Sequence, residues 1–429
     1  LLNKIADKKI KIGVIGLGYV GLPLAIRFCD EGFETVGFDI DKEKIKKLKL
    51  GKAYINHIPS KNIKKILAKK FMPTSNFDEV SNIDIIIICV PTPLGLKGEP
   101  DLSFIKNTLK TIKPYLKANQ LLVLESTTYP GTTQEVIAPI ITKAGFKPGK
   151  DYYIGYSPER EDPGNKIYNL KTIPKIVSGL TNSCLKITQE LYSSIVDQVV
   201  PVSSTKTAEM TKILENIHRS VNIGLINELK IVANKMDIDI YEVIKAASTK
   251  PFGFTPYYPG PGLGGHCLPI DPFYLIWKAQ KMGAKTKLIE LASKVNSKMP
   301  NYVIERSGEV LKGNGKSINN SRILVLGLSY KKNIDDSRES PSFIIIDMLM
   351  KLGARVEYSD PLFKKAPKTR KYMFKLESVV LSKKNIKSFD LIILATDHDT
   401  FNYDFILKEA NLIIDTRGKF GASQKVFQA

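Results

Sequence analysis

The chain has few cysteines, and their spacing excludes two common uses of that residue. Its 429 residues include four of them, Cys29, Cys89, Cys184 and Cys267. None pairs with another in a C-x-x-C pattern, which argues against a zinc site and against a disulfide framework. Cys29 and Cys89 lie within apolar segments and are predicted to be core residues. We therefore expect no bound metal.

The chain also lacks a long apolar run. No stretch approaches the roughly 20 apolar residues that a membrane span requires. The opening LLNKIADKKIKIGVIG has neither the apolar core nor the small-residue cleavage site of a signal peptide. The sequence thus predicts a cytoplasmic protein without a membrane partner.

Negative charge is scarce relative to positive charge. There are 64 Lys and Arg residues against 43 Asp and Glu residues, which gives a net charge of +21. Such an excess is one signature of nucleic-acid binding. Here the lysines are scattered, and no helix-turn-helix or aromatic RNA-binding signature occurs. We predict no nucleic-acid partner, and expect the surplus charge to bind polyanionic small molecules locally and otherwise to form a solvated surface.

The first part of the chain shows alternating strand and helix patterns. KIKIGVIGLGYVGLPLAIRFCDEGFETVGFD is typical of a strand, a glycine turn, an apolar helix and a second strand. Further buried strands are expected within 84–92, 121–127 and 151–159, separated by helix-length stretches. That alternation predicts a doubly wound parallel sheet, in a first domain that we place at 1–204.

The remainder divides into a helical middle and a second α/β unit. One long helix is expected over 205–236, a second over 239–248, and further helices from about 272, after the glycine-rich loop 251–266. Strands are then expected in RILVLGLSYK, ARVEYSD, DLIILAT and NLIIDTRG, after a linker at 314–321. The predicted fold is two Rossmann-like doubly wound domains joined by a helical region, with boundaries at 205–313 and 314–429.

A glycine motif predicts a dinucleotide site in the first domain. Gly16, Gly18 and Gly21 form G-x-G-x-x-G between a strand and a helix, and Asp39 ends the next strand. The glycines permit a tight turn and close approach of the backbone to a pyrophosphate, while Asp39 would bind the ribose hydroxyls and repel a 2′-phosphate. We therefore predict NAD rather than NADP. Thr92, at the end of the strand near 84–92, is expected at the same edge of the sheet.

The stretch GPGLGGHCLPIDPFY places Cys267 before an expected helix. A thiolate at a helix start is stabilised by unpaired N–H groups and can attack carbon, and Asp271 would lie one helical turn further on. The alternative is a small buried thiol beside a structural loop. On the long helix, Lys212, Asn216 and Arg219 share one stripe, which is either a solvated face or a group that stabilises an oxyanion.

With these residues identified, the whole chain resembles the UDP-glucose/GDP-mannose dehydrogenase family of nucleotide-sugar 6-dehydrogenases. The resemblance runs in order from GLGYVGLPLA through ESTTYPGTT, SPEREDPGN, the Lys212 helix and GPGLGGHCLPIDP to GLSYKKNIDDSRESPS and DTRGK. SPEREDPGN and PGPGLGGHC are most similar to the branch that acts on UDP-N-acetylglucosamine. The resemblance implies that two NAD molecules successively oxidise the C6 hydroxyl of the sugar, without release of an aldehyde.

The resemblance also implies roles for individual residues. Cys267 would capture the aldehyde as a thiohemiacetal, and Lys212 and Asn216 would stabilise an oxyanion. Thr127, Glu159 and Asp271 would position or activate water. The implied NAD contacts are Gly16, Gly18, Tyr19, Val20, Gly21, Asp39, Thr92, Thr127 and Arg338. The implied contacts with the UDP-sugar are Arg160, Glu161, Lys212, Asn216, Arg219, Gly264, Tyr330, Lys331 and Arg417.

The chain departs from the family pattern at two places. UDP-glucose enzymes carry two glutamates four residues apart, whereas this chain has Glu159 and Pro163, so the second carboxylate is missing or replaced by Glu161 or Asp162. An arginine that some members place before the cysteine has no counterpart in KPFGFTPYYPGPG. Both departures weaken UDP-glucose as the substrate. We expect His218 to be structural and His266 to support the neighbouring cysteine indirectly.

Three hypotheses therefore remain open at the level of sequence. The first is an NAD-dependent UDP-N-acetylglucosamine 6-dehydrogenase, with UDP-N-acetylmannosamine or UDP-glucose as alternative substrates. The second is a two-electron hydroxyacid dehydrogenase, which would need no cysteine. The third is a non-catalytic protein that binds NAD or a polyanion. The family resemblance and the apolar long helix further imply a homodimer or a higher homo-oligomer.

Overall fold

The structure is a computed structural model that describes residues 1–55, 58–95, 98–162, 167–265, 268–369, 371–421 and 423–429. The described chain divides into two compact units. The first comprises Leu1–Glu215 with Phe273–Ala284, and the second comprises Asn216–Pro272 with Lys285–Ala429. Two of the three divisions fall inside helices, in α8 (Thr205–Lys235) and α10 (Asp271–Lys281), and the third follows α10. The three-part division at 204 and 313 stays a prediction.

The first unit is built on a sheet with the order β3-β2-β1-β4-β5-β6-β7-β8 among its described residues. Its strands are β1 (Lys11–Ile15), β2 (Glu34–Phe38), β3 (Phe71–Thr74), β4 (Ile85–Ile88), β5 (Leu121–Leu124), β6 (Tyr153–Tyr156), β7 (Lys175–Gly179) and β8 (Val199–Pro201). The central strands are nearly all Ile, Leu and Val because both faces of a parallel sheet are covered. The two outermost strands contain Pro73 and Pro201.

Helices cover this sheet and supply its apolar core. They are α1 (Leu2–Ala6), α2 (Gly21–Asp30), α3 (Lys42–Lys49), α4 (Ser60–Lys69), α5 (Ser103–Ile112), α6 (Ala138–Lys143) and α7 (Asn182–Ser193), with the short turns η1 (Phe77–Asn82), η2 (Lys113–Tyr115) and η3 (Thr133–Ile137). Leu22 and Phe28 of α2, Ile63 of α4 and Leu191 of α7 belong to one buried cluster. These helices therefore share a core with the strands.

The strand order reverses direction beside β1, and this reversal positions the candidate site. The chain runs outward from β1 through β2 to β3, then crosses to the other side of β1 as β4. Where the order reverses, the segments that follow β1 and β4 diverge and leave a crevice at the carboxyl edge of the sheet. Gly16 follows β1, and Cys89 follows β4.

The predicted parallel sheet is confirmed for the strands expected from the sequence, and one pair, which includes the unexpected strand β7, is antiparallel. β6 and β7 are antiparallel, with Gly155 opposite Gly179 and Tyr156 opposite Ser178. The reason is the connection: the described residues between 156 and 175 form no helix, and a strand that returns without a crossover element pairs antiparallel. β3, β7 and β8 were not expected from the sequence.

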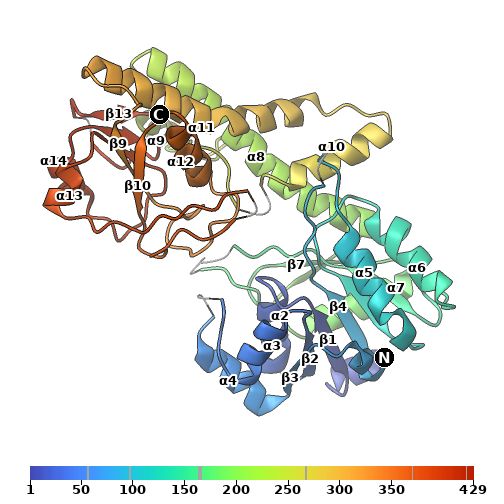
Figure 1. Cartoon of the computed structure of the whole chain (residues 1–429). Helices are drawn as coiled ribbons and strands as arrows, with labels where there is room; N and C mark the ends of the chain where they lie inside the picture. Colours follow the sequence, from blue (N-terminus) through green and yellow to red (C-terminus); the bar gives the residue numbers. More distant parts are fainter. Residues whose placement is uncertain (56–57, 96–97, 163–166, 266–267, 370, 422) are drawn as a thin grey trace. The chain divides into compact units, whose positions relative to one another are not determined.

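The second unit combines long helices with a second sheet. Beyond the carboxyl part of α8 it contains α9 (Ile240–Ala247) and α11 (Lys287–Gly313), and then α12 (Pro341–Lys351), α13 (Lys383–Lys387) and α14 (Tyr403–Glu409). Its strands are β9 (Arg322–Leu326), β10 (Arg355–Ser359), β11 (Leu391–Leu394), β12 (Ile413–Asp415) and β13 (Val426–Gln428). Figure 1 shows α8 as a long green helix and these strands in orange to red.

The second sheet is parallel and repeats the reversal seen in the first. Its order among the described residues is β10-β9-β11-β12-β13, so the chain leaves β9 for β10 and then crosses to β11 on the other side. Residues of β9, α12 and β11, including Val325, Ile345 and Ile393, pack in one buried cluster. The predicted fold class, two Rossmann-like sheets and a long central helix, is therefore confirmed.

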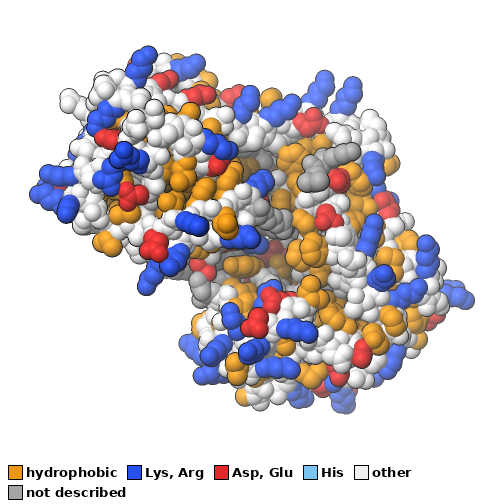
Figure 2. Space-filling view, in the orientation of Figure 1, with side chains coloured by type: hydrophobic (Ala, Val, Ile, Leu, Met, Phe, Trp, Pro, Cys, Tyr) orange, Lys and Arg blue, Asp and Glu red, His pale blue; other side chains and the backbone are white. Residues whose placement is uncertain are grey.

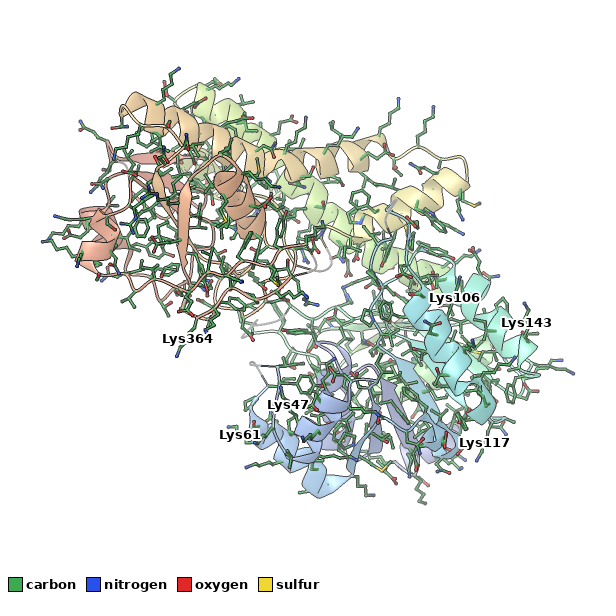
Figure 3. All side chains as sticks on the ribbon, viewed as in Figure 1. Lys47, Lys61, Lys106, Lys117, Lys143 and Lys364 are labelled. Carbon is green, nitrogen blue, oxygen red and sulfur yellow. The ribbon has the colours of Figure 1, made fainter. Side chains whose placement is uncertain are left out.

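The surplus of basic residues is spread over the surface. Figure 2 shows Lys and Arg side chains distributed over the visible face without one dominant patch. Six lysines labelled in Figure 3, on α3, α4, α5, α6 and two loops, extend away from the ribbon. None of the helices in the described part of the chain is long and apolar enough to cross a membrane.

Glu209 on α8 forms hydrogen bonds to the loop that follows β5. Its side chain is fully buried, and its Oε2 accepts a hydrogen bond from the Gly131 N–H at 2.5 Å. Its Oε1 accepts from the N–H of Thr133 at 2.8 Å and from the Thr133 hydroxyl at 2.7 Å. The carboxylate thereby satisfies the backbone donors at the start of η3, which otherwise lack partners.

We predict that Glu209→Gln lowers the free energy of unfolding by about 1–3 kcal/mol, because an amide N–H₂ placed toward these donors leaves a buried group unsatisfied. Urea denaturation of the purified protein measures the change. Glu190→Gln, on the exposed side of α7, is the matched control and should change stability by less than about 0.5 kcal/mol. Equal effects from the two substitutions would contradict this role for Glu209.

Candidate active site

The glycine turn after β1 has the geometry that its motif predicts. Gly16 has φ 94°, and a Cβ there would lie 2.8 Å from the carbonyl oxygen of Cys89. A Cβ at Gly21 would lie only 2.0 Å from the carbonyl oxygen of Gly16. At Gly18, by contrast, an added Cβ would meet no described atom within 4 Å. Two glycines are thus required by packing inside the chain, while the third leaves open space on the side where a ligand would approach.

Asp39 lies directly beside this turn. Its Oδ2 accepts a hydrogen bond from the Leu17 N–H at 3.0 Å, and its Oδ1 accepts one from the Asp41 N–H at 2.9 Å. The Lys44 amine is 3.5 Å from Oδ2. The carboxylate is therefore fixed against the glycine turn at the end of β2, which is the location that the motif requires for a group that binds ribose.

Thr92 and Thr127, which the sequence placed after two different strands, lie together. The Thr92 hydroxyl donates to the carbonyl oxygen of Thr127 at 2.7 Å. The Tyr274 hydroxyl, on the first-unit part of α10, donates to the carbonyl oxygen of Thr92. The segments after β4 and β5 are therefore joined at the carboxyl edge of the sheet.

Glu159 and Lys212 form an ion pair inside the first unit. The Lys212 amine lies 3.7 Å from Oε2 of Glu159, and the lysine is almost fully buried. The Glu161 N–H donates to Oε1 of Glu159. Burial, with a further contribution from the negative charge of Glu159, raises the pKa of Glu161 to about 7. Glu161 therefore holds its proton more readily than an exposed glutamate does.

Arg160 is held by α8 rather than exposed to solvent. One guanidinium nitrogen is 2.7 Å from Oε1 of Glu215, and the other donates to the carbonyl oxygen of Pro174 at 2.6 Å. The sequence gave no reason to single out Glu215, because an acidic residue on a helix is ordinarily a solvated one.

A buried ion pair near Glu159 and Glu161 was also not predicted from the sequence. The Lys175 amine lies 2.8 Å from Oε2 of Glu125, and the Tyr192 hydroxyl donates to Oε1 of the same carboxylate at 2.5 Å. Glu125 and Lys175 line a small cavity together with Glu159 and Glu161. One signal was present in the sequence: Glu125 directly follows the apolar run of β5, where a charged residue reaches the carboxyl edge of the sheet.

In the second unit, Asn216 and Asp271 are in direct contact. The Asn216 amide donates to Oδ2 of Asp271 at 2.5 Å, and both side chains are almost fully buried. α10 begins at Asp271, as expected from the helical pattern that starts at about 272, and not directly after residue 267. Residues 268–270 form a turn instead, and Pro272 occupies the second helical position, which suits proline.

Three positions discussed from the sequence, Pro163, His266 and Cys267, lie outside the described residues. Of the remaining stripe on α8, Lys212 and Asn216 are buried, whereas Arg219 is exposed. The interpretation of a wholly solvated face is therefore wrong for the first two. His218 is exposed, and its Nδ1 lies 3.0 Å from the Tyr257 hydroxyl.

The glycine-rich loop before residue 266 presses against the segment that follows β9. A Cβ at Gly264 would lie 2.6 Å from Cβ of Tyr330. Gly265 has φ 82°, and its N–H donates to the carbonyl oxygen of Arg338 at 2.9 Å. The guanidinium of Arg338 is itself paired with Asp336 at 2.6 Å. Three predicted site residues, Gly264, Tyr330 and Arg338, therefore belong to one packed assembly.

Arg417 lies at another part of the same loop. A Cβ at Gly260 would be 2.7 Å from a guanidinium nitrogen of Arg417, whose Nε donates to the carbonyl oxygen of Ala395 at 2.8 Å. The Gly260 N–H donates to Oδ1 of Asn227 at 2.9 Å. Asn227 is fully buried on α8 and was not identified from the sequence, because a single asparagine in a helix has no distinctive pattern.

Family models match most of the chain in three consecutive segments. The NAD binding domain of the UDP-glucose/GDP-mannose dehydrogenase family matches residues 10–196. The central domain of that family matches residues 206–298, and its UDP binding domain matches residues 324–422. The order of the three segments is the order in which the sequence places its motifs.

Individual relatives match over nearly their full length. Protein CapL of Staphylococcus aureus is 36% identical over 95% of this chain and 95% of its own. A UDP-N-acetyl-D-glucosamine 6-dehydrogenase of Salmonella typhi is 35% identical over 92% of this chain and 91% of its own. Among solved structures, a UDP-D-ManNAc dehydrogenase of Pyrococcus horikoshii superimposes with a TM-score of 0.88 at 32% identity, covering 98% of both chains.

We predict that Gly264→Ala destabilises the protein by about 1–3 kcal/mol. The added methyl group would overlap Cβ of Tyr330 and force the glycine-rich loop away from the segment after β9. Thermal denaturation measures the loss. Gly313→Ala is the matched control: it lies at the end of α11, where a Cβ meets no described atom within 4 Å, so stability should be unchanged or slightly increased. A Gly264→Ala protein as stable as the control would rule out the close packing.

Proposed function

The chain belongs to the UDP-glucose/GDP-mannose dehydrogenase family, and from that premise we propose that it oxidises UDP-N-acetylglucosamine at C6 to the uronic acid. Members of the family are NAD-dependent UDP-sugar 6-dehydrogenases. The observation that carries the choice of sugar is the near-full-length similarity to the relative from Salmonella typhi. The chain's SPEREDPGN and PGPGLGGHC segments, which resemble the same branch, support it.

The first unit suits NAD. Gly18 leaves open space where a pyrophosphate would lie, and Asp39 is held at the position from which a carboxylate binds ribose hydroxyls. Tyr19, Val20, Thr92 and Arg338 complete the proposed contacts. When bound, NAD supplies an acceptor for the hydride that leaves C6 of the sugar. The chain itself would bind and orient the sugar and the cofactor, and its side chains would accept and donate protons.

Lys212 and Asn216 are proposed to stabilise negative charge on the sugar oxygen. A buried ammonium group is effective beside a developing oxyanion because the low local dielectric strengthens their attraction. The ion pair of Lys212 with Glu159, at 3.7 Å, offsets part of the cost of burying its charge. The Asn216 amide is oriented by Asp271, so its position does not depend on substrate.

Cys267 is proposed as the nucleophile of the second half-reaction. Its thiolate adds to the aldehyde carbon and forms a C–S bond, and the alkoxide oxygen takes a proton. Loss of a hydride from that carbon, and of the hydroxyl proton, gives a thioester. Water then adds to the thioester carbonyl, the C–S bond breaks, and the thiolate is regenerated with the carboxylate product.

Glu159, Glu161, Thr127 and Asp271 are proposed to handle protons and water in these steps. Glu159, whose Oε2 lies 3.7 Å from the Lys212 amine, is the proposed group that takes a proton from water. Glu161, whose pKa burial raises to about 7, can hold and return a proton near neutral pH. It is our candidate for the second carboxylate that Pro163 replaces.

The UDP-sugar itself is assigned to residues of several segments. Lys331 and Tyr330 are proposed to bind the nucleotide, and the guanidinium groups of Arg160, Arg219 and Arg417 suit phosphate or a developing sugar carboxylate. The backbone at Gly264 would approach the sugar. Arg219 and Gly264 belong to the predicted domain 205–313, and Tyr330, Lys331 and Arg417 belong to 314–429. Arg160 belongs to 1–204, as do all the proposed NAD contacts except Arg338.

We further propose that the protein is at least a homodimer and acts in the cytoplasm. In the second unit, α8 carries an exposed apolar row, Leu225, Leu229 and Val232, with exposed fractions of 53%, 42% and 48%. Exposed apolar side chains repeated along one helix favour association.

UDP-N-acetylmannosamine is the second candidate substrate. It is favoured by the solved structure of a UDP-D-ManNAc dehydrogenase, which matches this fold with a TM-score of 0.88. The two sugars differ only in configuration at C2, so a few contacts around the acetamido group decide between them.

We predict that kcat/KM is at least about tenfold higher for UDP-N-acetylglucosamine than for UDP-N-acetylmannosamine or UDP-glucose, since a mismatched C2 group loses about one hydrogen bond. Two NADH should form for each sugar oxidised. Absorbance at the NADH band, together with product mass, measures both quantities. A preference for UDP-N-acetylmannosamine would replace the first substrate by the second, and one NADH per sugar would contradict the four-electron reaction.

We predict that Cys267→Ser lowers uronate formation by about a thousandfold or more, because an alcohol is a weaker nucleophile and its ester a poorer acyl donor. A covalent sugar adduct of the variant should be visible by mass spectrometry. Cys184→Ser is the control: that thiol is buried in α7 and accepts a hydrogen bond from the Ile154 N–H at 3.3 Å, so turnover should be retained. Full conversion by Cys267→Ser would exclude the thiol as nucleophile.

A further inference from the structure

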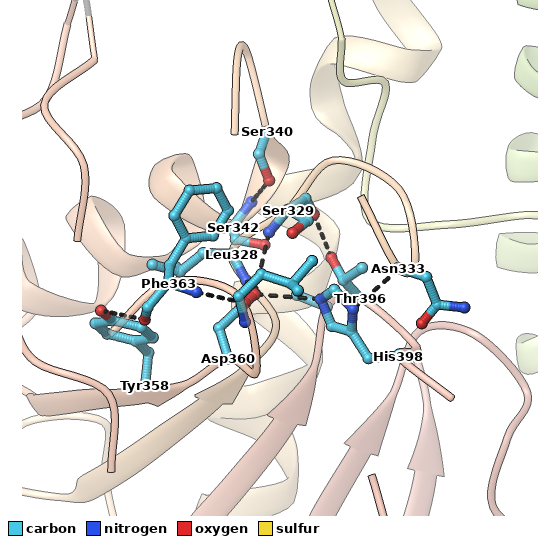
Figure 4. Close-up of polar contacts among 12 residues, drawn as sticks. Leu328, Ser329, Asn333, Ser340, Ser342, Tyr358, Asp360, Phe363, Thr396 and His398 are labelled. Carbon is cyan, nitrogen blue, oxygen red and sulfur yellow. Dashed lines mark hydrogen bonds and ion pairs between the residues drawn. The ribbon is translucent and has the colours of Figure 1, made fainter. Parts of the chain in front are cut away.

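His398 is fully buried beyond the carboxyl end of β11, where it joins segments that follow three strands of the second unit (Figure 4). Its Nε2 lies 3.2 Å from Oδ2 of Asp360, the residue after β10. Its Nδ1 lies 3.0 Å from the backbone nitrogen of Asn333, in the loop after β9. A single imidazole therefore connects the ends of β9, β10 and β11.

These two contacts determine where the imidazole carries its proton. A backbone N–H only donates, so Nδ1 of His398 must accept from Asn333 and carry no proton. Nε2 then carries the proton and donates to Asp360. Burial by itself would raise the pKa of Asp360, but hydrogen bonds from His398 and from the Leu328 N–H lower it below its ordinary value. The neutral ring with its proton on Nε2 satisfies both neighbours.

The position of Asp360 corresponds to that of Asp39 in the first unit. In both sheets an aspartate follows the second strand and accepts from the N–H one residue after the glycine turn, at 3.0 Å from Leu17 and at 2.6 Å from Leu328. Asp360 differs from Asp39 in that its Oδ2 also lies 3.2 Å from Nε2 of His398. In the second unit this carboxylate therefore holds a histidine.

Asn333 is fixed by its side chain as well. Its φ is 61°, in the left-handed region that asparagine tolerates better than most residues. Its amide donates to Oδ2 of Asp399 at 2.6 Å, and its Oδ1 accepts from the Asp399 N–H at 3.1 Å. Asn333 is thus clamped by two consecutive residues, His398 and Asp399.

The segment held in this way carries proposed substrate contacts. Residues 329–338 contain Tyr330 and Lys331, and the carbonyl oxygen of Ser329 accepts from the Thr396 hydroxyl at 2.5 Å. On its other side the segment packs against Gly264 and bonds to Gly265. Its position is set by the sheet beneath it and by the glycine-rich loop beside it.

We propose that His398 is a positioning residue for the UDP-sugar: by accepting the Asn333 N–H, its neutral imidazole holds residues 329–338 where Lys331 meets the substrate. The inference rests on the proposed function, in which Lys331 binds the nucleotide. His398 is buried beneath the segment and acts through it.

Two substitutions separate the two contacts of the ring. His398→Asn keeps an acceptor near the position of Nδ1, and His398→Gln keeps a donor near that of Nε2. At about pH 8 we expect the Kd for UDP, measured by calorimetry, to be about tenfold weaker in His398→Gln and within about threefold of wild type in His398→Asn. The KM for NAD should be unchanged in both variants, and melting temperatures report whether each one folds.

Equal losses of UDP affinity in the two variants would overturn the inference. A wild-type protein that binds UDP but oxidises no UDP-sugar would refute the proposed function, while the UDP affinities would still decide the role of His398.

Discussion

Close contact between main-chain segments at the ends of β1 and β9 is the constraint on which the rest of the structure depends. A Cβ at Gly21 would meet the carbonyl oxygen of Gly16 at 2.0 Å, and one at Gly327 would meet Cβ of Thr396 at 2.4 Å. Both glycine turns also donate to the adjacent strand at 2.8 Å, from Gly16 to Phe38 and from Gly327 to Ser359. The same device thus brings loops to the carboxyl edge of each sheet, where the candidate residues are found.

The two units use this shared frame for different purposes. In the first, open space remains at Gly18, and Asp39 is oriented beside it, which suits a dinucleotide. In the second, the equivalent Asp360 contacts His398, and the segment after β9 packs against the glycine-rich loop. The repeated fold therefore occurs once in a segment that matches an NAD binding domain and once in a segment that matches a UDP binding domain.

Sequence reasoning succeeded where a local pattern has one physical interpretation. The glycine turn, Asp39 and the long helix, expected over 205–236 and found at Thr205–Lys235, each follow from spacing or periodicity. It failed for β7, whose antiparallel pairing depends on a non-helical connection, and for partners such as Glu215 and Lys175. Those contacts join residues far apart in the chain, and neither partner has a distinctive neighbourhood. The roles of the predicted site residues stay predictions.

The outermost strands of the first sheet impose a limit on how molecules of this protein can associate. β3 contains Pro73 and β8 contains Pro201, and proline has no N–H to offer to an added strand. Each border thus presents an interrupted row of donors, which disfavours extension of the sheet from one copy into the next. Copies of the protein are therefore expected to associate through helices rather than through strands. The two prolines also disfavour aggregation by strand pairing.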